Sequence, residues 1–406
     1  MNVKIFPSKA KGSVTAPPSK SYAHRLLIGS AMAKGESVLY HVAPSQDILA
    51  TMDCLTALGA SFTIEGDTVY IRGCGGAPKA TAPLCCRESG STLRFLLPLT
   101  LLSGEGGEIC GTPRLMERGI SVYQSVLSHK NIAFSLEKEA IFVKGQLTPS
   151  EFTLKGDVSS QFISGLFFAL PLLNGDSTVR VLPPVESRSY IDMTVDALAR
   201  FGIQIVEAEE NTFFIKGNQT YEPLTATVEG DWSNAAFLFG LNELGGAVSV
   251  SGLEEESYQG DKICLDYFSR LSEKGKTIDL QDCPDLAPVL FALASTKGHD
   301  VVFSGTKRLK IKESDRAATM AEELSKMGIC LSVLENQVIV HGGTLTPPTQ
   351  RLCGHGDHRI VMALSLLLTL VGGELEGAEA VSKSYPDFFT QLKHLGIEVK
   401  DATNER

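Results

Sequence analysis

The chain has 406 residues, of which 43% are hydrophobic and 21% are charged, and its formal net charge at pH 7 is −10. A chain longer than about 300 residues exceeds what one hydrophobic core usually supports, so two domains are expected. The acidic balance argues against a general nucleic-acid-binding protein, because such proteins carry basic surfaces that neutralise phosphates. A binding site for an anion must therefore be a local concentration of cationic side chains.

No segment of the sequence indicates a membrane or secreted protein. Residues 1–7 lack the long apolar core of a signal peptide, and the longest apolar stretch, residues 360–371, is too short to span a bilayer. The nine cysteines form no Cys-x-x-Cys pair and have no metal-like spacing. We therefore expect reduced thiols and a cytoplasmic location.

Two kinds of helix alternate along the chain, each recurring about every 70 residues. The first kind is amphipathic, ends near a glycine or asparagine, and leads into a strand, a turn and a second strand. In residues 48–71 this pattern is clear, with Gly66 and Asp67 forming the hairpin turn. Further copies end at Asn131, Gly202, Gly275, Gly328 and Gly396, with a shorter spacing between the fourth and fifth copies.

The second kind of helix is nearly all apolar, which predicts that it is buried. Each copy opens on polar or charged residues, at positions 19–21, 88–94, 159–162, 231–234, 283–286 and 356–359. Serine and aspartate at such positions are suited to capping a buried helix, and this alone is a sufficient explanation for any single start. Three starts also carry Lys, Arg or His in the first turn, where a cation opposes the helix dipole. An anion beside those starts would remove the conflict, so they predict anion binding.

The repeats predict an α/β fold of two domains, each built from three α/β units with buried helices directed at a shared cleft. The expected crossings lie near residues 11–14 and 227–230, so that 1–13 with 229–406 form one discontinuous domain and 14–228 form the other. A doubly wound nucleotide-binding fold is the competing interpretation. It requires Gly-x-Gly-x-x-Gly after the first strand, and the sequence has no such motif.

Charged residues gather at two further places. If Glu313 begins a helix, Lys312 and Arg316 lie one turn apart with Glu313 beside both, although a solvated helix start is an adequate alternative. His355 and His358 have a metal-like spacing, but no third ligand is evident, so we expect no metal site.

These segments resemble the 5-enolpyruvylshikimate-3-phosphate synthase family of enolpyruvyl transferases. The resemblance covers essentially the whole chain in the family's order, and two globular domains of three α/β units are also the family's fold. It rests on Pro-Ser-Lys-Ser-x-x-x-Arg at 18–25, the segment 90–94, Pro-Arg-Leu-Met-Glu-Arg at 113–118, Ser-Ser-Gln-Phe at 159–162, Pro-Asp at 284–285, Lys-Glu-Ser-Asp-Arg at 312–316, Asp-His-Arg at 357–359 and Lys-Ser-Tyr-Pro-Asp at 383–387. Glu88, Phe95 and Trp232 depart from the residues usual in the family.

The resemblance implies transfer of the carboxyvinyl group of phosphoenolpyruvate to the 5-hydroxyl of shikimate 3-phosphate, releasing phosphate, in the shikimate pathway to chorismate and aromatic amino acids. It implies that shikimate 3-phosphate binds Lys20, Ser21, Arg25, Ser159, Ser160, Gln161, Ser187, Tyr190, Asp285 and Lys312. It implies that phosphoenolpyruvate binds Lys20, Gly90, Arg118, Gln161, Arg316, Arg359 and Lys383. Guanidinium groups suit both substrates, because each carries a phosphate and a carboxylate. The retained Gly90 implies sensitivity to glyphosate.

The reaction that the resemblance implies is an addition followed by an elimination, through a tetrahedral intermediate. Asp285 is the candidate base for the hydroxyl, Glu313 the candidate proton donor to the methylene carbon, and Lys20 the group that assists departure of phosphate. Alternatively, Asp285 caps the helix of residues 286–294 and Glu313 only pairs with Arg316. No metal or organic cofactor is needed, and the expected partners of a monomeric chain are the two small-molecule substrates.

Two other functions remain open from the sequence. The sister enzyme that acts on UDP-N-acetylglucosamine shares the fold, but its members carry Lys-Asn near the start and a cysteine in a mobile loop, whereas Lys20 is followed by Ser21. A non-catalytic anion-binding protein on the same scaffold is the second alternative. Lys20, Asp285 and Glu313 are all present, which disfavours it.

Overall fold

The computed structural model describes residues 1–402 and divides the chain into two compact units. Unit 1 comprises Met1–Pro17 and the segment from Gly230 onward, and unit 2 comprises Pro18–Glu229. The first crossing lies later than the expected position between residues 13 and 14. The reason is that β2 (Lys11–Thr15) pairs along its whole length with β15 (Ala247–Ser251) of unit 1. In the described part of the chain, no helix has both the length and the apolar content to cross a bilayer.

Unit 2 repeats one sheet pattern three times. Its four-stranded sheets have the orders β14-β3-β5-β4, β6-β7-β9-β8 and β10-β11-β13-β12. In each sheet the first two strands are parallel and the rest are antiparallel. The strands are β3 (Glu36–Tyr40), β4 (Ser61–Glu65), β5 (Thr68–Arg72), β6 (Leu84–Cys85), β7 (Gly107–Cys110), β8 (Ala133–Leu136), β9 (Ala140–Lys144), β10 (Glu151–Lys155), β11 (Ser177–Leu182), β12 (Ile205–Glu209), β13 (Thr212–Ile215) and β14 (Thr225–Thr227).

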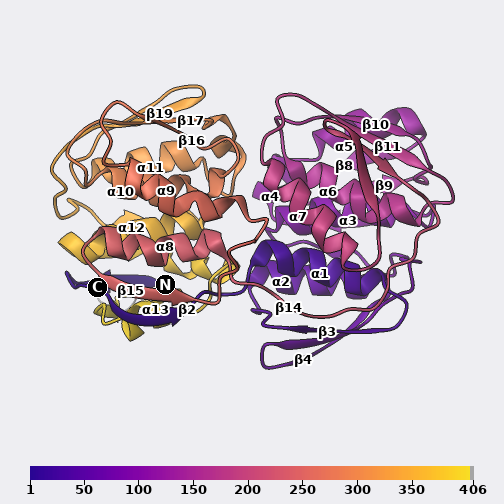
Figure 1. Cartoon of the computed structure of the whole chain (residues 1–406), viewed down its shortest axis with the longest axis horizontal. Helices are drawn as coiled ribbons and strands as arrows, with labels where there is room; N and C mark the ends of the chain where they lie inside the picture. Colours follow the sequence, from indigo (N-terminus) through magenta and orange to yellow (C-terminus); the bar gives the residue numbers. More distant parts are fainter. Residues whose placement is uncertain (403–406) are drawn as a thin grey trace. The chain divides into compact units, whose positions relative to one another are not determined.

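The helices of unit 2 pack together between these sheets (Figure 1). Helix α3 packs on α6, α6 on α7 and α1 on both α2 and α7. The helices are α1 (Lys20–Met32), α2 (Gln46–Ala57), α3 (Gly90–Thr100), α4 (Pro113–Arg118), α5 (Ser121–Leu127), α6 (Ser160–Ala169) and α7 (Arg188–Ala199). The apolar runs of α1, α3 and α6 are buried along nearly their whole length, as their composition predicts.

Unit 1 contains two sheets of the same kind and one shorter sheet. The orders are β16-β17-β19-β18, β20-β21-β1-β22 and β15-β2. Strand β1 takes the place of a hairpin strand, because it pairs antiparallel with both β21 and β22. The strands not yet given are β1 (Asn2–Ile5), β16 (Thr277–Asp279), β17 (Val301–Ser304), β18 (Leu331–Val333), β19 (Gln337–Val340), β20 (Leu352–Cys353), β21 (Gly373–Glu376) and β22 (Val399–Asp401).

The fourth amphipathic helix departs from the predicted repeat. Helix α9 (Cys264–Arg270) leads into the single strand β16 and not into a hairpin. Strand β16 pairs with β17 and is the first strand of the sheet β16-β17-β19-β18. This missing hairpin accounts for the shorter spacing between the fourth and fifth copies.

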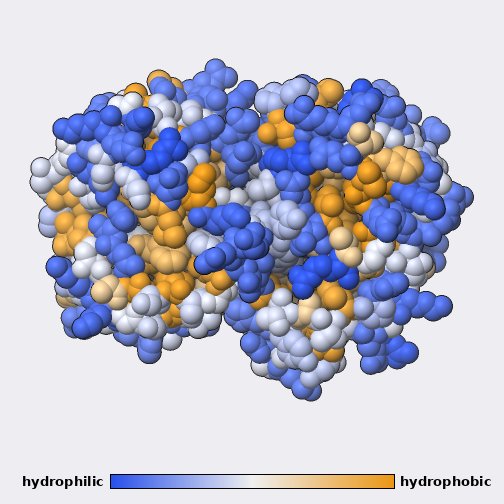
Figure 2. Space-filling view, in the orientation of Figure 1, coloured by the Kyte–Doolittle hydropathy of each residue, from blue (hydrophilic) through white to orange (hydrophobic). Residues whose placement is uncertain are grey.

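The buried helices of unit 1 are α8 (Trp232–Glu243), α10 (Ala287–Ala294) and α12 (His358–Val371), which pack on one another. Helices α11 (Arg316–Ser325) and α13 (Phe388–His394) complete the unit. The condition that a helix begins at Glu313 is not met. A 3-10 turn ends at Ile311 and Lys312 has an extended backbone, so α11 begins at Arg316 with Asp315 as its cap. The face in Figure 2 is mostly hydrophilic, with hydrophobic patches between the polar residues.

Side chains cap five of the six buried helices, as their opening residues indicated. Ser19, Ser89, Ser159, Asp231 and Asp357 each accept a hydrogen bond from a backbone N–H in the first turn of α1, α3, α6, α8 and α12. Helix α10 differs, because the 3-10 turn Pro284–Leu286 precedes it and no side chain caps it. The capping alternative for Asp285 is therefore wrong, and its carboxylate is available for other contacts.

Candidate functional site

Asp285 lies at the centre of a charged cluster in unit 1. Its Oδ1 accepts hydrogen bonds from Arg316 at 2.7 Å and from Lys312 at 3.1 Å, and its Oδ2 accepts one from Arg359 at 3.1 Å. Burial acts to raise the pKa of Asp285, but Arg359, Lys312 and Arg316 outweigh burial and hold that pKa well below its usual range. The carboxylate is therefore ionised at neutral pH.

Arg316 connects this cluster to two more carboxylates. Its side chain is only 1% exposed, its Nε donates to Asp357 at 2.8 Å, and its terminal nitrogen donates to Glu313 at 2.7 Å. The expected pairing of Glu313 with Arg316 is confirmed. Asp357 is fully buried and also accepts from the backbone N–H of Arg359, so one carboxylate both caps α12 and orients Arg316.

Lys383 lies at the same helix start, although it follows α12 in the sequence. Its Nζ donates to the carbonyl of Gly356, at 2.5 Å, in the loop that precedes α12. The structure therefore brings together in unit 1 the predicted residues Asp285, Lys312, Glu313, Arg316, Arg359 and Lys383. Asp357 belongs to the Asp-His-Arg motif of residues 357–359, but the sequence does not predict its burial beside Arg316.

The low pKa of Asp285 predicts a loss of stability in acid. A carboxyl whose pKa is lower in the folded than in the unfolded state stabilises the fold above its unfolded value, about 3.9, and the contribution disappears as the pH falls through the folded value. We expect the free energy of unfolding of unit 1 to fall as the pH drops below about 4. Trp232, the only tryptophan, lies in unit 1 and reports the transition by fluorescence in urea. In Asp285→Asn the free energy of unfolding should fall less as the pH is lowered. An unchanged pH dependence would contradict the low pKa of Asp285.

In unit 2, two guanidinium groups flank the start of α3. A Cβ on Gly90 would lie 3.0 Å from a terminal nitrogen of Arg94 and 3.1 Å from one of Arg118. Arg94 donates to Gln161 at 2.6 Å, and Gln161 donates in turn to Ser91 at 2.9 Å. The positive end of the α3 dipole and two guanidinium groups meet at one point, which suits a phosphate or carboxylate. Sequence reasoning missed Arg94 as a site residue, although its place one turn after Gly90 was a signal for it.

Helix α1 presents two cations that already have protein partners. Lys20 pairs with Asp47 of α2 at 2.8 Å, with both side chains mostly buried. Arg25 is buried and donates to Thr194 at 2.9 Å, to the carbonyl of Ser21 at 2.7 Å and to the carbonyl of Tyr190 at 3.0 Å. Burial lowers the pKa of Arg25 to about 10, which still leaves it charged at neutral pH.

The remaining predicted residues of unit 2 lie at the starts of α6 and α7. Ser159 caps α6 and Ser160 is its first residue. Ser187 precedes α7 in a left-handed backbone conformation, and the ring of Tyr190 lies 5.9 Å from the Arg25 guanidinium. Arg25 therefore connects the starts of α1 and α7. Asp47 has no role among the sequence predictions, because nothing in its local pattern places it beside Lys20.

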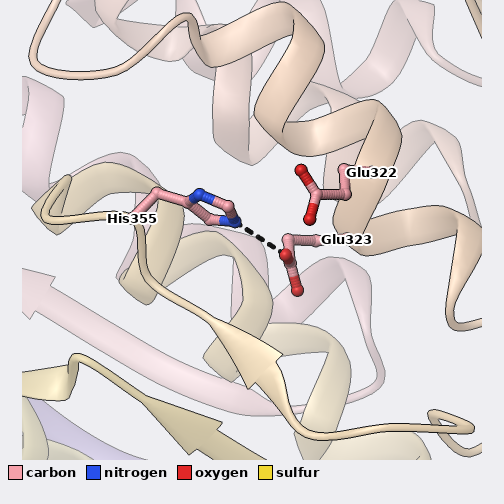
Figure 3. Close-up of side chains that lie close together, drawn as sticks. All are labelled: Glu322, Glu323 and His355. Atoms are coloured by element: carbon pink, nitrogen blue, oxygen red, sulfur yellow. Dashed lines mark hydrogen bonds and ion pairs between the residues drawn. The ribbon is translucent and has the colours of Figure 1, made fainter.

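Glu322, Glu323 and His355 form a group of potential metal ligands in unit 1 (Figure 3). No third ligand for His355 was evident from the sequence, and His358 does not belong to this group. The fully buried Glu323 is already satisfied, because one oxygen lies 2.7 Å from both His355 and Lys326 and the other accepts the Cys353 N–H at 2.9 Å. These contacts join the loop before α12 to Glu323, and Lys326 already supplies a positive charge to this carboxylate.

The family model for EPSP synthase (3-phosphoshikimate 1-carboxyvinyltransferase) matches residues 6–392. The chain belongs to the EPSP synthase family. A relative from Clostridium perfringens named 3-phosphoshikimate 1-carboxyvinyltransferase is 39% identical over 97% of this chain and 98% of its own length. One of the same name from Clostridium kluyveri is 38% identical over 98% of both chains.

Solved structures show the same fold. An EPSP synthase structure from Acinetobacter baumannii superposes with a TM-score of 0.79 at 24% identity, covering 98% of this chain and 100% of that chain. At this identity the likeness concerns the fold, and it confirms the predicted α/β architecture of the EPSP synthase family.

Proposed function

We propose that the chain transfers the carboxyvinyl group of phosphoenolpyruvate to the 5-hydroxyl of shikimate 3-phosphate and releases phosphate, in the pathway to chorismate and aromatic amino acids. The family match and the names of the relatives support this function. The structural observation that carries the proposal is the gathering of guanidinium groups at capped helix starts in both units. Both substrates carry a phosphate and a carboxylate, which such starts are suited to bind.

The substrate contacts proposed from the family resemblance divide between the two units. For shikimate 3-phosphate they are Lys20, Ser21, Arg25, Ser159, Ser160, Gln161, Ser187, Tyr190, Asp285 and Lys312. For phosphoenolpyruvate they are Lys20, Gly90, Arg118, Gln161, Arg316, Arg359 and Lys383. We add Arg94 to the second set, because its guanidinium lies beside Gly90 and Gln161.

The proposed mechanism begins with Asp285 accepting the proton of the attacking hydroxyl. Asp285 is ionised, as a base must be, but the three cations around it hold its proton affinity low. Phosphoenolpyruvate would draw Arg316 and Arg359 toward its own charges and so raise the proton affinity of Asp285 when both substrates are bound. Lys20 would assist the departing phosphate. No cofactor is needed, because phosphoenolpyruvate is itself an activated donor, and we propose that the enzyme acts as a cytoplasmic monomer.

Glu313 is the proposed proton donor to the methylene carbon of phosphoenolpyruvate. It accepts a hydrogen bond from Arg316 at 2.7 Å, an arrangement suited to the ionised carboxylate, so Glu313 must take up a proton before it can donate one. Glu313→Gln should lower kcat about 100-fold or more, because the amide has no proton to transfer. The exposed Glu335→Gln is the matched control. Near-normal single-turnover rates in Glu313→Gln would rule out this role.

The proposed function is tested by measuring phosphate release from phosphoenolpyruvate with each of two acceptors. We expect release with shikimate 3-phosphate and none with UDP-N-acetylglucosamine. Release with the nucleotide sugar alone would favour the sister enzyme. Release with neither acceptor, from a folded protein that still binds phosphate, would favour the non-catalytic alternative.

Gly90→Ala should weaken phosphoenolpyruvate binding more than it affects turnover. The added methyl would lie 3.0 Å from Arg94 and 3.1 Å from Arg118, so both guanidinium groups must shift by a few tenths of an ångström. Loss of one well-placed charged hydrogen bond, about 1.5 kcal/mol, corresponds to a roughly tenfold rise in KM. Gly107→Ala is the control, because a Cβ there meets its neighbours at an ordinary 3.4 Å. Steady-state kinetics with varied phosphoenolpyruvate measure the KM of both variants. Equal KM values would contradict the predicted effect of Gly90→Ala.

A further inference from the structure

Two cysteines of unit 2 face each other on neighbouring parallel strands. The register of β6 and β7 pairs Leu84 with Ile109 and Cys85 with Cys110. Leu84 and Ile109 are buried, whereas Cys85 is exposed and Cys110 is partly exposed, so both thiols lie on the outer side of the strand pair. Paired strands lie about 4.8 Å apart, and disulfides join Cα atoms separated by roughly 4.4–6.8 Å. The Cα separation therefore already suits a disulfide, but the bond also needs Cβ atoms about 3.8 Å apart, so its formation draws the two strands toward each other.

The Cys85 thiol is close enough to affect the ionisation of Cys110. Burial, and then the neighbouring Cys85 thiol, raise the pKa of Cys110 to about 11. Cys54 and Cys86 also lie near each other, but both are buried and out of reach of a dissolved oxidant. Cys85 is thus the thiol that meets an oxidant first, and Cys110 is the thiol placed to resolve the product.

This cysteine pair lies directly before two elements of the candidate site. Beyond it the β6–α3 and β7–α4 loops stay joined, because the Cys86 N–H donates to the Cys110 carbonyl at 2.7 Å and the Thr112 N–H to the Arg87 carbonyl at 2.8 Å. Thr112 caps α4, which ends at Arg118, and Ser89 caps α3, which begins at Gly90. A change in the separation of Cys85 and Cys110 is therefore transmitted to Gly90 and Arg118.

The loops have little room to absorb such a change. A Cβ on Gly111 would lie only 2.8 Å from the Arg87 carbonyl oxygen, so the two loops are in close backbone contact. Because packed backbones move together, drawing the strand ends toward each other shifts both loops.

We propose that Cys85 and Cys110 form a reversible disulfide, in the presence of a small-molecule disulfide, that weakens anion binding between Gly90 and Arg118. The Cys85 thiolate attacks one sulfur of the oxidant, releases one equivalent of thiolate and forms a mixed disulfide. The Cys110 thiolate then attacks the Cys85 sulfur and releases the second equivalent. Two protein thiols are oxidised, one external disulfide is reduced to two thiols, and the protein's two protons pass to the released thiolates. The kinetic consequence rests on the proposed function, whereas formation of the bond does not.

The first measurement is mass-spectrometric mapping of the full-length protein after incubation with oxidised glutathione. We expect a peptide linking Cys85 to Cys110, with the mass of two hydrogen atoms lost and no glutathione retained on either residue. Cys110→Ser should stop at the glutathione adduct on Cys85. Cys330→Ser, which removes another exposed thiol in unit 1, should leave the link unchanged. Glutathione persisting on Cys85 of the unaltered chain beside a free Cys110 thiol, or a link between other cysteines, would overturn the proposal.

The second measurement is the KM for phosphoenolpyruvate before and after oxidation. We expect an increase of about tenfold in the linked protein, of the size that sub-ångström displacement of binding groups produces. Dithiothreitol should reverse it, and Cys85→Ser should not show it. A linked protein with unchanged KM would overturn the regulatory part of the proposal. A reduced, folded protein without transferase activity would instead refute the proposed function, and the mapping would still decide whether the disulfide forms.

Discussion

Asp285→Asn is expected to lower kcat by about two to four orders of magnitude, which is the usual contribution of a general base. The amide cannot accept the hydroxyl proton, and it also leaves Lys312, Arg316 and Arg359 without the carboxylate that holds them together. Substrate binding should change less than turnover, because all three cations remain. Single-turnover kinetics with both substrates at saturating concentration isolate the chemical step.

Asp282→Asn is the matched control for this variant. Asp282 is exposed and lies three residues before Asp285. Asp282→Asn therefore removes one negative charge from the same segment but leaves the Asp285 carboxylate in place. We expect Asp282→Asn to retain normal turnover. If Asp285→Asn also turned over at a near-normal rate, Asp285 would have only an electrostatic role and another group would be the base.

Arg316→Ala is expected to destabilise unit 1 by about 3–5 kcal/mol, because removing one member of a buried ion cluster leaves the others uncompensated. The variant leaves Asp357 fully buried without its guanidinium partner and removes a cation from Asp285 and Glu313. Urea unfolding followed by Trp232 fluorescence measures the change in unit 1.

Arg351→Ala provides the comparison within the same unit. Its ion pair with Glu374 is substantially exposed, with side-chain exposures of 40% and 29%. Solvent-exposed pairs contribute about 0–1 kcal/mol, so the unfolding midpoint should barely move. Equal shifts in the two variants would mean that the buried cluster around Arg316 contributes no more to stability than a surface pair.

The sequence predicted the repeating architecture because its signals are local. Apolar helices opening on Ser19, Ser89, Ser159, Asp231 and Asp357 proved to be capped and buried, since capping depends on residues within one turn. The helix start considered at Glu313 lies too early, because α11 begins at Arg316. The sequence contains no sign that the 3-10 turn of residues 307–311 delays the helix.

Contacts between distant segments could not be predicted in this way. Lys20 was expected to be available for substrate, but Asp47, on the next helix, pairs with it. Asp357 lies 41 residues after Arg316 in the chain, and only the packing of α11 on α12 brings the two side chains together. Residue types and family resemblance indicated which charged side chains belong to the candidate site. The partners that hold these side chains in place depend on the tertiary structure.

The interrupted course of the chain has a consequence for how the protein folds during synthesis. Unit 2 is one continuous segment, so all of its sheets can form as soon as it leaves the ribosome. Strands β1 and β2 are made before unit 2, whereas their partners β15, β21 and β22 are made after unit 2 is complete. Strands β1 and β2 therefore stay unpaired until these partners are made. Contacts between segments so far apart in the chain form slowly, because closing a long loop costs more entropy. Folding should proceed from the inserted unit outward, and the last step should be the closure of the sheet that contains both ends of the described chain.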